Sequence, residues 1–196
     1  MRNKDIFKMA QLMESMGLNE KTTSKETVKS GLAPWVGENP MVLILGTLPS
    51  DVSIKFQAYY QNKSHNSFYK IMEHLFQRTA WQSDKDFITS NNIALWDCMK
   101  SANRKGNLDA NIKDDVPNDV KKFLQTHPSI SAVVLNGGLA KKKFYRYFMV
   151  SNFNERIKVI PLISSSNAAR KKFENKLEEW RIIKDIINAH PKVHKD

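Results

Sequence analysis

Residues 42–50 read VLILGTLPS, an apolar run that ends at Gly46 in a turn of small residues. The apolar part of this stretch, taken as residues 41–45, is the first of four similar runs. Each run has the length of a strand and is nearly continuous, and the other three are residues 92–96, 131–135 and 157–162. Such runs, without alternation of polar residues, are typical of strands that are buried on both faces of a sheet. The four runs therefore predict the strands of one central sheet.

Helical patterns separate and follow these runs, and they cover residues 67–77, 116–125, 139–149 and 168–188. Strands that alternate with helices favour an α/β fold with a largely parallel sheet. We therefore predict a three-layer α/β/α sandwich around a short, mostly parallel sheet of four strands.

The chain has an N-terminal part that does not share this pattern. Apolar residues lie at helical spacing over residues 3–17, whereas residues 19–31 are polar and lack a core pattern. The sequence thus predicts an N-terminal helix and polar linker over residues 1–32. A single α/β domain is predicted over residues 33–196.

The charge balance points to a polyanionic partner. The 196 residues contain 31 Lys and Arg against 20 Asp and Glu, which gives a net charge of +11. An excess of this size is typical of proteins that bind nucleic acid or an anionic membrane surface, although a basic surface without such a partner has the same composition. The membrane alternative lacks a strongly amphipathic cationic helix with exposed aromatic residues. No apolar run is long enough to span a membrane.

The cysteine and histidine content favours neither disulfides nor a metal site. Cys98 is the single cysteine, so no disulfide can form within the chain, and we expect a reducing cytoplasm as its location and a buried thiol as its role. The five histidines lack the spacing of a metal site, and the chain has no GxGxxG or GxxxxGK[ST] motif. We therefore expect no metal and no cofactor.

Small and polar residues follow all four predicted strands. The four segments are Gly46–Ser50, Asp97-Cys98, Asn136–Gly138 and Ser164–Asn167. Ordinary turn chemistry explains any one of them. However, ligands bind beyond the carboxyl ends of the strands in an open parallel sheet, and all four segments are expected at that edge. Together they predict a functional site there.

Basic residues begin the helices that follow the third and fourth strands. They are Lys141, Lys142, Lys143 and Arg146 in one helix, and Arg170, Lys171, Lys172 and Lys176 in the other. A solvated charged face is the ordinary reading of such runs. Because these residues would flank the predicted site, we expect them to contact a phosphate backbone.

The densest aromatic and amide cluster lies between the first strand and the first helix. Tyr59 and Tyr60 precede His65, Asn66, Phe68 and Tyr69. Aromatic faces stack on nucleobases, and amides pair with base edges. Tyr59 and Tyr60 are the better stacking candidates because they are expected in a loop before a helix, whereas Phe68 and Tyr69 would serve equally well as core residues.

These motifs, in this order, resemble the uracil-DNA glycosylase superfamily, and most closely its hypoxanthine-DNA (deoxyinosine) glycosylase branch. The likeness covers roughly residues 41–182. It rests on residues 42–50, on Tyr59-Tyr60 with Asn66-Ser-Phe68-Tyr69, on residues 93–97 and 106–112, on 133–137, and on Ile160-Pro161 with Ser164, Asn167-Ala168 and Arg170.

The resemblance implies an enzyme that extrudes a deaminated base from DNA and hydrolyses its N-glycosidic bond without a metal. Other branches of the superfamily hold an Asp or Asn after the glycine, where this chain has Thr47 and Leu48. In the hypoxanthine branch the catalytic amide is the one matched here by Asn66, with Asp97 as the second candidate for activating water.

The resemblance also assigns residues to the base and to DNA. The predicted base-contacting residues are Gly46, Thr47, Leu48, Tyr60, Phe68 and Asn136. The predicted DNA-contacting residues are Ser50, Lys141, Ser164, Ser165, Ser166, Asn167 and Arg170. The expected partner is damaged or mismatched duplex DNA, with single strands left open, and the expected state is a monomer.

Two other functions stay open at this point. The same fold would suit a glycosylase specific for uracil or G·U mismatches. The absence of an Asp or Asn at residues 47–48 also leaves open a DNA-binding relative that has lost catalysis.

Overall fold

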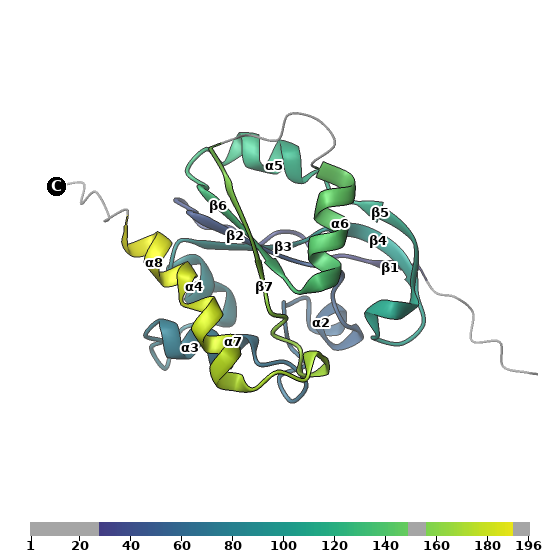
Figure 1. Ribbon diagram of the computed structural model, residues 1–196, viewed down its shortest axis with the longest axis horizontal. Helices are drawn as coiled ribbons and strands as arrows, with labels where there is room; N and C mark the ends of the chain where they lie inside the picture. Colours follow the sequence, from purple (N-terminus) through teal and green to yellow (C-terminus); the bar gives the residue numbers. More distant parts are fainter. Residues whose placement is uncertain (1–27, 149–155, 190–196) are drawn as a thin grey trace, which may run out of the picture.

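The central sheet consists of four parallel strands in the order β3-β2-β6-β7 (Figure 1). The computed structural model describes residues 28–148 and 156–189. Within it the strands are β2 (Val42–Gly46), β3 (Ile93–Asp97), β6 (Ala132–Asn136) and β7 (Lys158–Leu162). The predicted α/β fold with its short parallel sheet is therefore confirmed.

Helices cover both faces of this sheet because its strands are apolar on both sides. Val42 and Ile44 pack against one layer of helices, whereas Leu43 and Leu45 pack against the other. The first layer holds α3 (Phe68–Leu75), α4 (Asp84–Thr89), α7 (Phe173–Trp180) and α8 (Ile182–Asn188). The second layer holds α5 (Val120–Thr126) and α6 (Gly138–Phe148). The three-layer sandwich follows directly from this division.

A second sheet, which the sequence did not predict, lies beside the central one. Its strands are β1 (Val28–Ser30), β4 (Met99–Arg104) and β5 (Ile112–Pro117), which are antiparallel in the order β1-β4-β5. A short 3-10 turn, η1 (Asp109–Asn111), leads into β5. The strands escaped detection because they are rich in charged and polar residues and form no continuous apolar run.

The boundary of the domain differs from the prediction. Residues 28–31 were expected to belong to a polar linker, but Val28–Ser30 pairs with β4. Leu32 also belongs to the hydrophobic core, since it is 8% exposed. Ordered structure thus begins before residue 33, whereas the predicted N-terminal helix at residues 3–17 lies outside the described residues.

Two predicted helices also differ in the structure. Residues 168–188 were expected to form one helix, but they contain η2 (Asn167–Ala169), α7 and α8. Arg170 takes a left-handed backbone conformation with φ 49°, which ends the first turn. The helix expected over residues 116–125 starts only at Val120, because Asp119 caps it and Val116-Pro117 complete β5.

The residues that connect β2 to α3 lie at the carboxyl end of the sheet. The short helix α2 (Asp51–Phe56) comes first, and Ser50 caps it by accepting a hydrogen bond from the N–H of Ser53.

Within residues 28–148 and 156–189, no helix is long and apolar enough to cross a bilayer.

Candidate active site

The carboxyl ends of the four strands bring the predicted loops together. Gly46 lies opposite Asp97 in the pairing of β2 with β3, and Asn136 lies opposite Leu162 in the pairing of β6 with β7. A Cβ atom on Gly46 would lie 3.3 Å from Tyr60 Oη and closer still to Asp97 Oδ1. Glycine is therefore required here, because Tyr60 and Asp97 both approach the backbone of β2.

Asn136 joins three parts of this edge. Its Nδ2 donates to Tyr60 Oη at 3.1 Å and to Ser165 Oγ at 2.9 Å, while its Oδ1 accepts from the Ser165 N–H at 2.8 Å. Both amide hydrogens thus bind protein atoms. Asn136 was expected to read the base edge, but in the structure it holds Tyr60 and the last loop in place.

Ser165 was predicted to contact DNA, and this prediction is wrong for its side chain. The residue is 0% exposed, and its hydroxyl and N–H both bind Asn136. Its neighbours Ser164 and Ser166 are half-buried and Asn167 is exposed, so the surface of the last loop is formed by these three residues.

The segment that carries Asn66 is hydrogen-bonded to the last loop. Asn66 and Ser166 form an antiparallel bridge. The Ser67 N–H donates to the Ser165 carbonyl at 2.9 Å, and the Asn167 N–H donates to the His65 carbonyl at 3.0 Å. Asn66 and Asn136 are thus held at the same edge of the sheet, because both bind the strand-like part of the last loop.

The side chain of Asn66 is half-buried, and its carbonyl oxygen accepts one hydrogen bond from the protein. Its Oδ1 accepts a hydrogen bond from the Phe68 N–H at 2.9 Å, which fixes the turn that starts α3. A carbonyl oxygen can accept a second hydrogen bond. Asn66 is therefore able to hold a water molecule while its own position is fixed by the helix.

Tyr60 and Phe68 form a stacked pair. Their ring centroids are 3.9 Å apart and the ring planes differ by 17°. Phe68 is 0% exposed, so its predicted contact with a base is corrected: it supports the Tyr60 ring from the core. Leu48 is also buried, whereas Tyr60 and Thr47 keep partial exposure at the edge.

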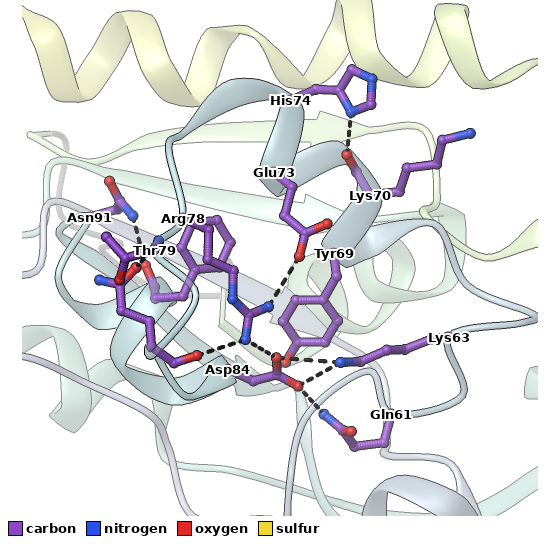
Figure 2. A network of polar contacts seen from close by, with 12 residues as sticks. Gln61, Lys63, Tyr69, Lys70, Glu73, His74, Arg78, Thr79, Asp84 and Asn91 are labelled. Atoms are coloured by element: carbon purple, nitrogen blue, oxygen red, sulfur yellow. Dashed lines mark hydrogen bonds and ion pairs between the residues drawn. The ribbon is translucent and has the colours of Figure 1, made fainter.

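A network of charged and amide groups holds the loop between Tyr60 and Asn66 (Figure 2). Asp84, at the start of α4, accepts from Gln61 Nε2 at 2.7 Å and from Arg78 at 2.7 Å, and it pairs with Lys63 at 3.0 Å. Burial opposes ionisation of Asp84, but the hydrogen bonds from Gln61, Lys63 and Arg78 lower its pKa. The contact with Gln61 fixes the residue next to Tyr60, whose backbone has φ 56°.

Replacing Asp84 with Asn should loosen this loop. We expect a loss of about 1–2 kcal/mol in the free energy of unfolding at pH 7, since the partly buried Arg78 and the exposed Lys63 lose their charged partner. Because the folded-state pKa lies below its ordinary value of 3.8, the contribution of Asp84 is complete above about pH 4 and is lost as the pH falls through the folded pKa. Urea unfolding at pH 7 and at pH 3 measures this. Glu73→Gln, which alters the exposed partner of Arg78, should change stability by less, and an equal effect would contradict the assignment.

The predicted site residue Asp97 is almost completely buried. It is 4% exposed, and its Oδ2 has no hydrogen-bond partner among the described residues. Burial raises its pKa to about 7; Arg104 opposes this shift, and Asp109 adds to it. Asn118 caps the turn after β3, since its Nδ2 donates to the Asp97 carbonyl at 2.8 Å.

The second sheet positions the loop after β2 through Arg104 and Asp109, which were not among the predicted site residues. Arg104 is 1% exposed and donates to the carbonyls of Leu48, at 3.2 Å, and Pro49. Thr47 Oγ1 donates to Asp109 Oδ1 at 3.1 Å. The family likeness over residues 106–112 includes Asp109, whereas Arg104 lies outside the stretches that carry the likeness.

The predicted basic surface is smaller than expected. Lys141 and Arg170 are exposed, as are Lys142, Arg146, Lys171 and Lys172. Lys143 is buried and pairs with Asp115 at 2.6 Å, and Lys176 is buried and donates to the Ser166 carbonyl at 2.7 Å. Lys143 therefore stabilises α6, and Lys176 supports the last loop from within, so neither is available to phosphates. Ser50, likewise predicted to contact DNA, uses its hydroxyl to cap α2 and remains half-buried.

Within the described ranges, no group of three or more His, Cys, Asp or Glu side chains is arranged to hold a metal ion. Cys98 is buried between β3 and the second helical layer, and burial raises its pKa, as expected of a thiol that packs in the core.

Comparison with known proteins shows which family this chain belongs to. The model of the uracil DNA glycosylase superfamily matches residues 33–186. The chain belongs to the uracil-DNA glycosylase superfamily. As a superfamily member it is a DNA glycosylase, with DNA as its substrate.

Two relatives of this glycosylase come from species of Methanosarcina. It is 32% identical over 161 residues to a hypoxanthine DNA glycosylase of Methanosarcina acetivorans, which covers 80% of this chain and 98% of the relative. A protein with the same name from Methanosarcina barkeri is 31% identical over 159 residues, with 78% and 95% covered. The solution NMR structure of an M. acetivorans protein assigned to the uracil DNA glycosylases superposes with a TM-score of 0.69 at 30% identity, and covers 83% of this chain and 99% of that one.

Proposed function

We propose that this glycosylase releases hypoxanthine from deoxyinosine in DNA, without a metal and without cutting the strand. The observation that supports the proposal is the hydrogen-bonded pairing of residues 64–67 with residues 165–167, which holds Asn66 against the last loop; Asn136 binds both that loop and Tyr60. The names and identities of the two archaeal relatives support hypoxanthine as the base.

In the proposed reaction the base leaves with the electron pair of the glycosidic bond, water attacks the resulting sugar cation, and the proton that this water loses neutralises the departed base anion. Asn66 holds and orients that water through the free lone pair of its Oδ1, because an amide cannot act as a general base as a carboxylate does. The Tyr60 ring, supported by Phe68, stacks on the extruded base. Phosphates of the DNA stabilise the cation electrostatically.

The test is a panel of oligonucleotides that carry inosine, uracil in a G·U pair, xanthine or only normal bases. Base release is measured with and without alkali, in duplexes and in single strands. The proposal expects inosine to be cleaved fastest and no strand break without alkali. Faster release of uracil would favour the alternative glycosylase, and salt-dependent DNA binding without base release on any substrate would show a relative that has lost catalysis.

The exposed cations beside the site give a separate prediction. Lys141 lies in the first turn of α6, Arg170 follows η2 and precedes α7, and both are exposed. We expect Lys141→Gln and Arg170→Gln each to reduce the slope of log affinity against log salt by about 1 on any DNA sequence. Fluorescence anisotropy at several salt concentrations measures this. Lys184→Gln, an exposed position on α8, should leave the slope unchanged, and an equal reduction there would show only a general charge effect.

We propose further that the enzyme acts as a monomer in the cytoplasm, as its composition and its single buried cysteine suggest.

A further inference from the structure

Lys176 is a buried cation that no acidic side chain of the described residues neutralises. It is 2% exposed, and its ammonium group donates to the main-chain carbonyls of Ser165, at 3.3 Å, and Ser166, at 2.7 Å. Glu179, one turn further along α7, accepts from the Ile163 N–H at 2.8 Å instead. Burial lowers the pKa of Lys176, and no charged group of the described residues opposes this shift. Lysines are almost never fully buried without a partner of opposite charge, so the charge of Lys176 requires an explanation.

A tether for the last loop does not need this charge. Trp180, on the same helix, donates a neutral N–H to the Ile163 carbonyl at 2.9 Å. The loop is also held by the Ser67 N–H, which donates to the Ser165 carbonyl, and by Asn136. A neutral donor would bind the same carbonyls without the cost of removing an ammonium group from water. The charge therefore indicates an anion that binds at this loop and that the described residues do not provide.

The opposite side of the loop offers a place for this anion. The peptide bonds of the described residues are trans, so the Ser166 N–H points away from the Ser165 carbonyl that faces Lys176. This N–H donates to Ser164 Oγ at 3.2 Å, which leaves the Ser164 hydroxyl its own hydrogen to donate. An anion that accepts this hydrogen would be connected to Lys176 through one peptide unit, and hydrogen bonds in such a chain strengthen one another.

We propose that Lys176 is a positioning residue whose charge, behind the last loop, stabilises a DNA phosphate bound by the Ser164 hydroxyl. The inference deepens the proposed function and rests on it for the approach of DNA to this loop, but not for the identity of the base. Lys176 does not touch the phosphate, because the backbone of the loop lies between them. Since Asn66 pairs with Ser166, a strand whose nucleotide reaches Asn66 has to pass this loop, and its phosphates are the anions that it brings.

The experiment replaces single phosphates of the lesion strand with uncharged methylphosphonates and measures binding by fluorescence anisotropy. The duplex carries one 2′-fluoro-2′-deoxyinosine, which resists hydrolysis, so that binding reaches equilibrium. For the unaltered protein, we expect one methylphosphonate beside the lesion to weaken binding by roughly 10-fold. Lys176→Gln keeps a donor for the carbonyls but removes the charge. It should bind the all-phosphate duplex roughly 10-fold more weakly and lose the sensitivity at that one position, because both changes remove the same interaction.

Two further variants separate the charge from the tether. Lys176→Arg keeps the charge and should keep the sensitivity, whereas Ser164→Ala should lose it at the same position. Lys143→Gln is the matched control, because Lys143 is also a buried lysine but pairs with Asp115 at 2.6 Å. This variant should unfold at a lower urea concentration and keep the sensitivity to every phosphate.

The Nζ resonance of Lys176 in the unaltered protein gives a second measurement that needs no substitution. Its 15N chemical shift should change when the all-phosphate duplex binds and change much less with the methylphosphonate at that one position. An equal change with both duplexes, or full sensitivity of Lys176→Gln at every position, would overturn the inference and leave Lys176 as a tether. Sensitivity that depends on Lys176, in a protein that releases uracil faster than hypoxanthine, would support the inference while refuting the proposed function.

Discussion

Asn66→Ala should lower the single-turnover rate of inosine cleavage by about 100-fold or more, with DNA binding largely retained. The expected size follows from the loss of a group that positions the attacking water, for which factors of about 10²–10⁴ are typical. The protein should still fold, because Asn66 is half-buried and the main-chain hydrogen bonds that join Ser67 to Ser165 and Asn167 to His65 do not involve its side chain. Rapid mixing with excess enzyme isolates the chemical step from product release.

Asn62→Ala provides the control for this experiment. Asn62 lies in the same loop, and its side-chain oxygen accepts hydrogen bonds from Ser64 and from the ring of His65, both on the surface. A rate close to that of the unaltered enzyme is expected for this variant. If Asn66→Ala also cleaved at a nearly normal rate, Asn66 would have no catalytic role, and Asp97 would become the first candidate for activating water.

Gly137→Ala should reduce both stability and activity. Gly137 has φ 98°, a conformation that residues with a side chain rarely adopt, and a Cβ atom there would lie 2.7 Å from the Cβ of Ser164. The backbone conformation alone costs about 1–2 kcal/mol, and displacement of the last loop adds to it. We expect a total loss of about 3 kcal/mol in the free energy of unfolding and at least a tenfold loss in cleavage rate.

The neighbouring glycine separates local strain from a general effect of alanine. A Cβ atom on Gly138 would meet nothing within 4 Å, and the residue starts α6. Gly138→Ala should therefore leave cleavage unchanged and leave stability equal or slightly higher. Urea unfolding and single-turnover cleavage of both variants measure the difference. Equal behaviour of the two would show that the contact between Gly137 and Ser164 does not hold the last loop.

The central fold was predictable from the sequence because each buried strand is a continuous apolar run. Val42–Gly46 and Ala132–Asn136 are buried along their whole length, so hydrophobicity alone marks them. The second sheet was not predictable in this way. Lys29 on β1 pairs with Asp51 on α2 and binds the Gly106 carbonyl, and charged and polar residues interrupt β4 and β5, so these strands leave no apolar pattern.

The site was predictable in its location but less so in the roles of its residues. Gly46, Asp97, Asn136 and the last loop do meet at one edge, as parallel strands require. The sequence could not show that the Asn136 amide donates hydrogen bonds to Ser165 and Tyr60, or that the Phe68 ring stacks on Tyr60. Such assignments depend on contacts between residues far apart along the chain.

The pairing of residues 64–67 with residues 165–167 has a consequence for engineering. Ser67 Oγ donates to Asn167 Oδ1 at 3.0 Å, and Asn167 Nδ2 donates to the Ser64 carbonyl at 3.2 Å. The conformation of each segment therefore depends on hydrogen bonds to the other. A loop transplanted alone from another glycosylase would arrive without its counterpart. Chimeras with altered lesion preference should therefore exchange both segments together, as one cassette.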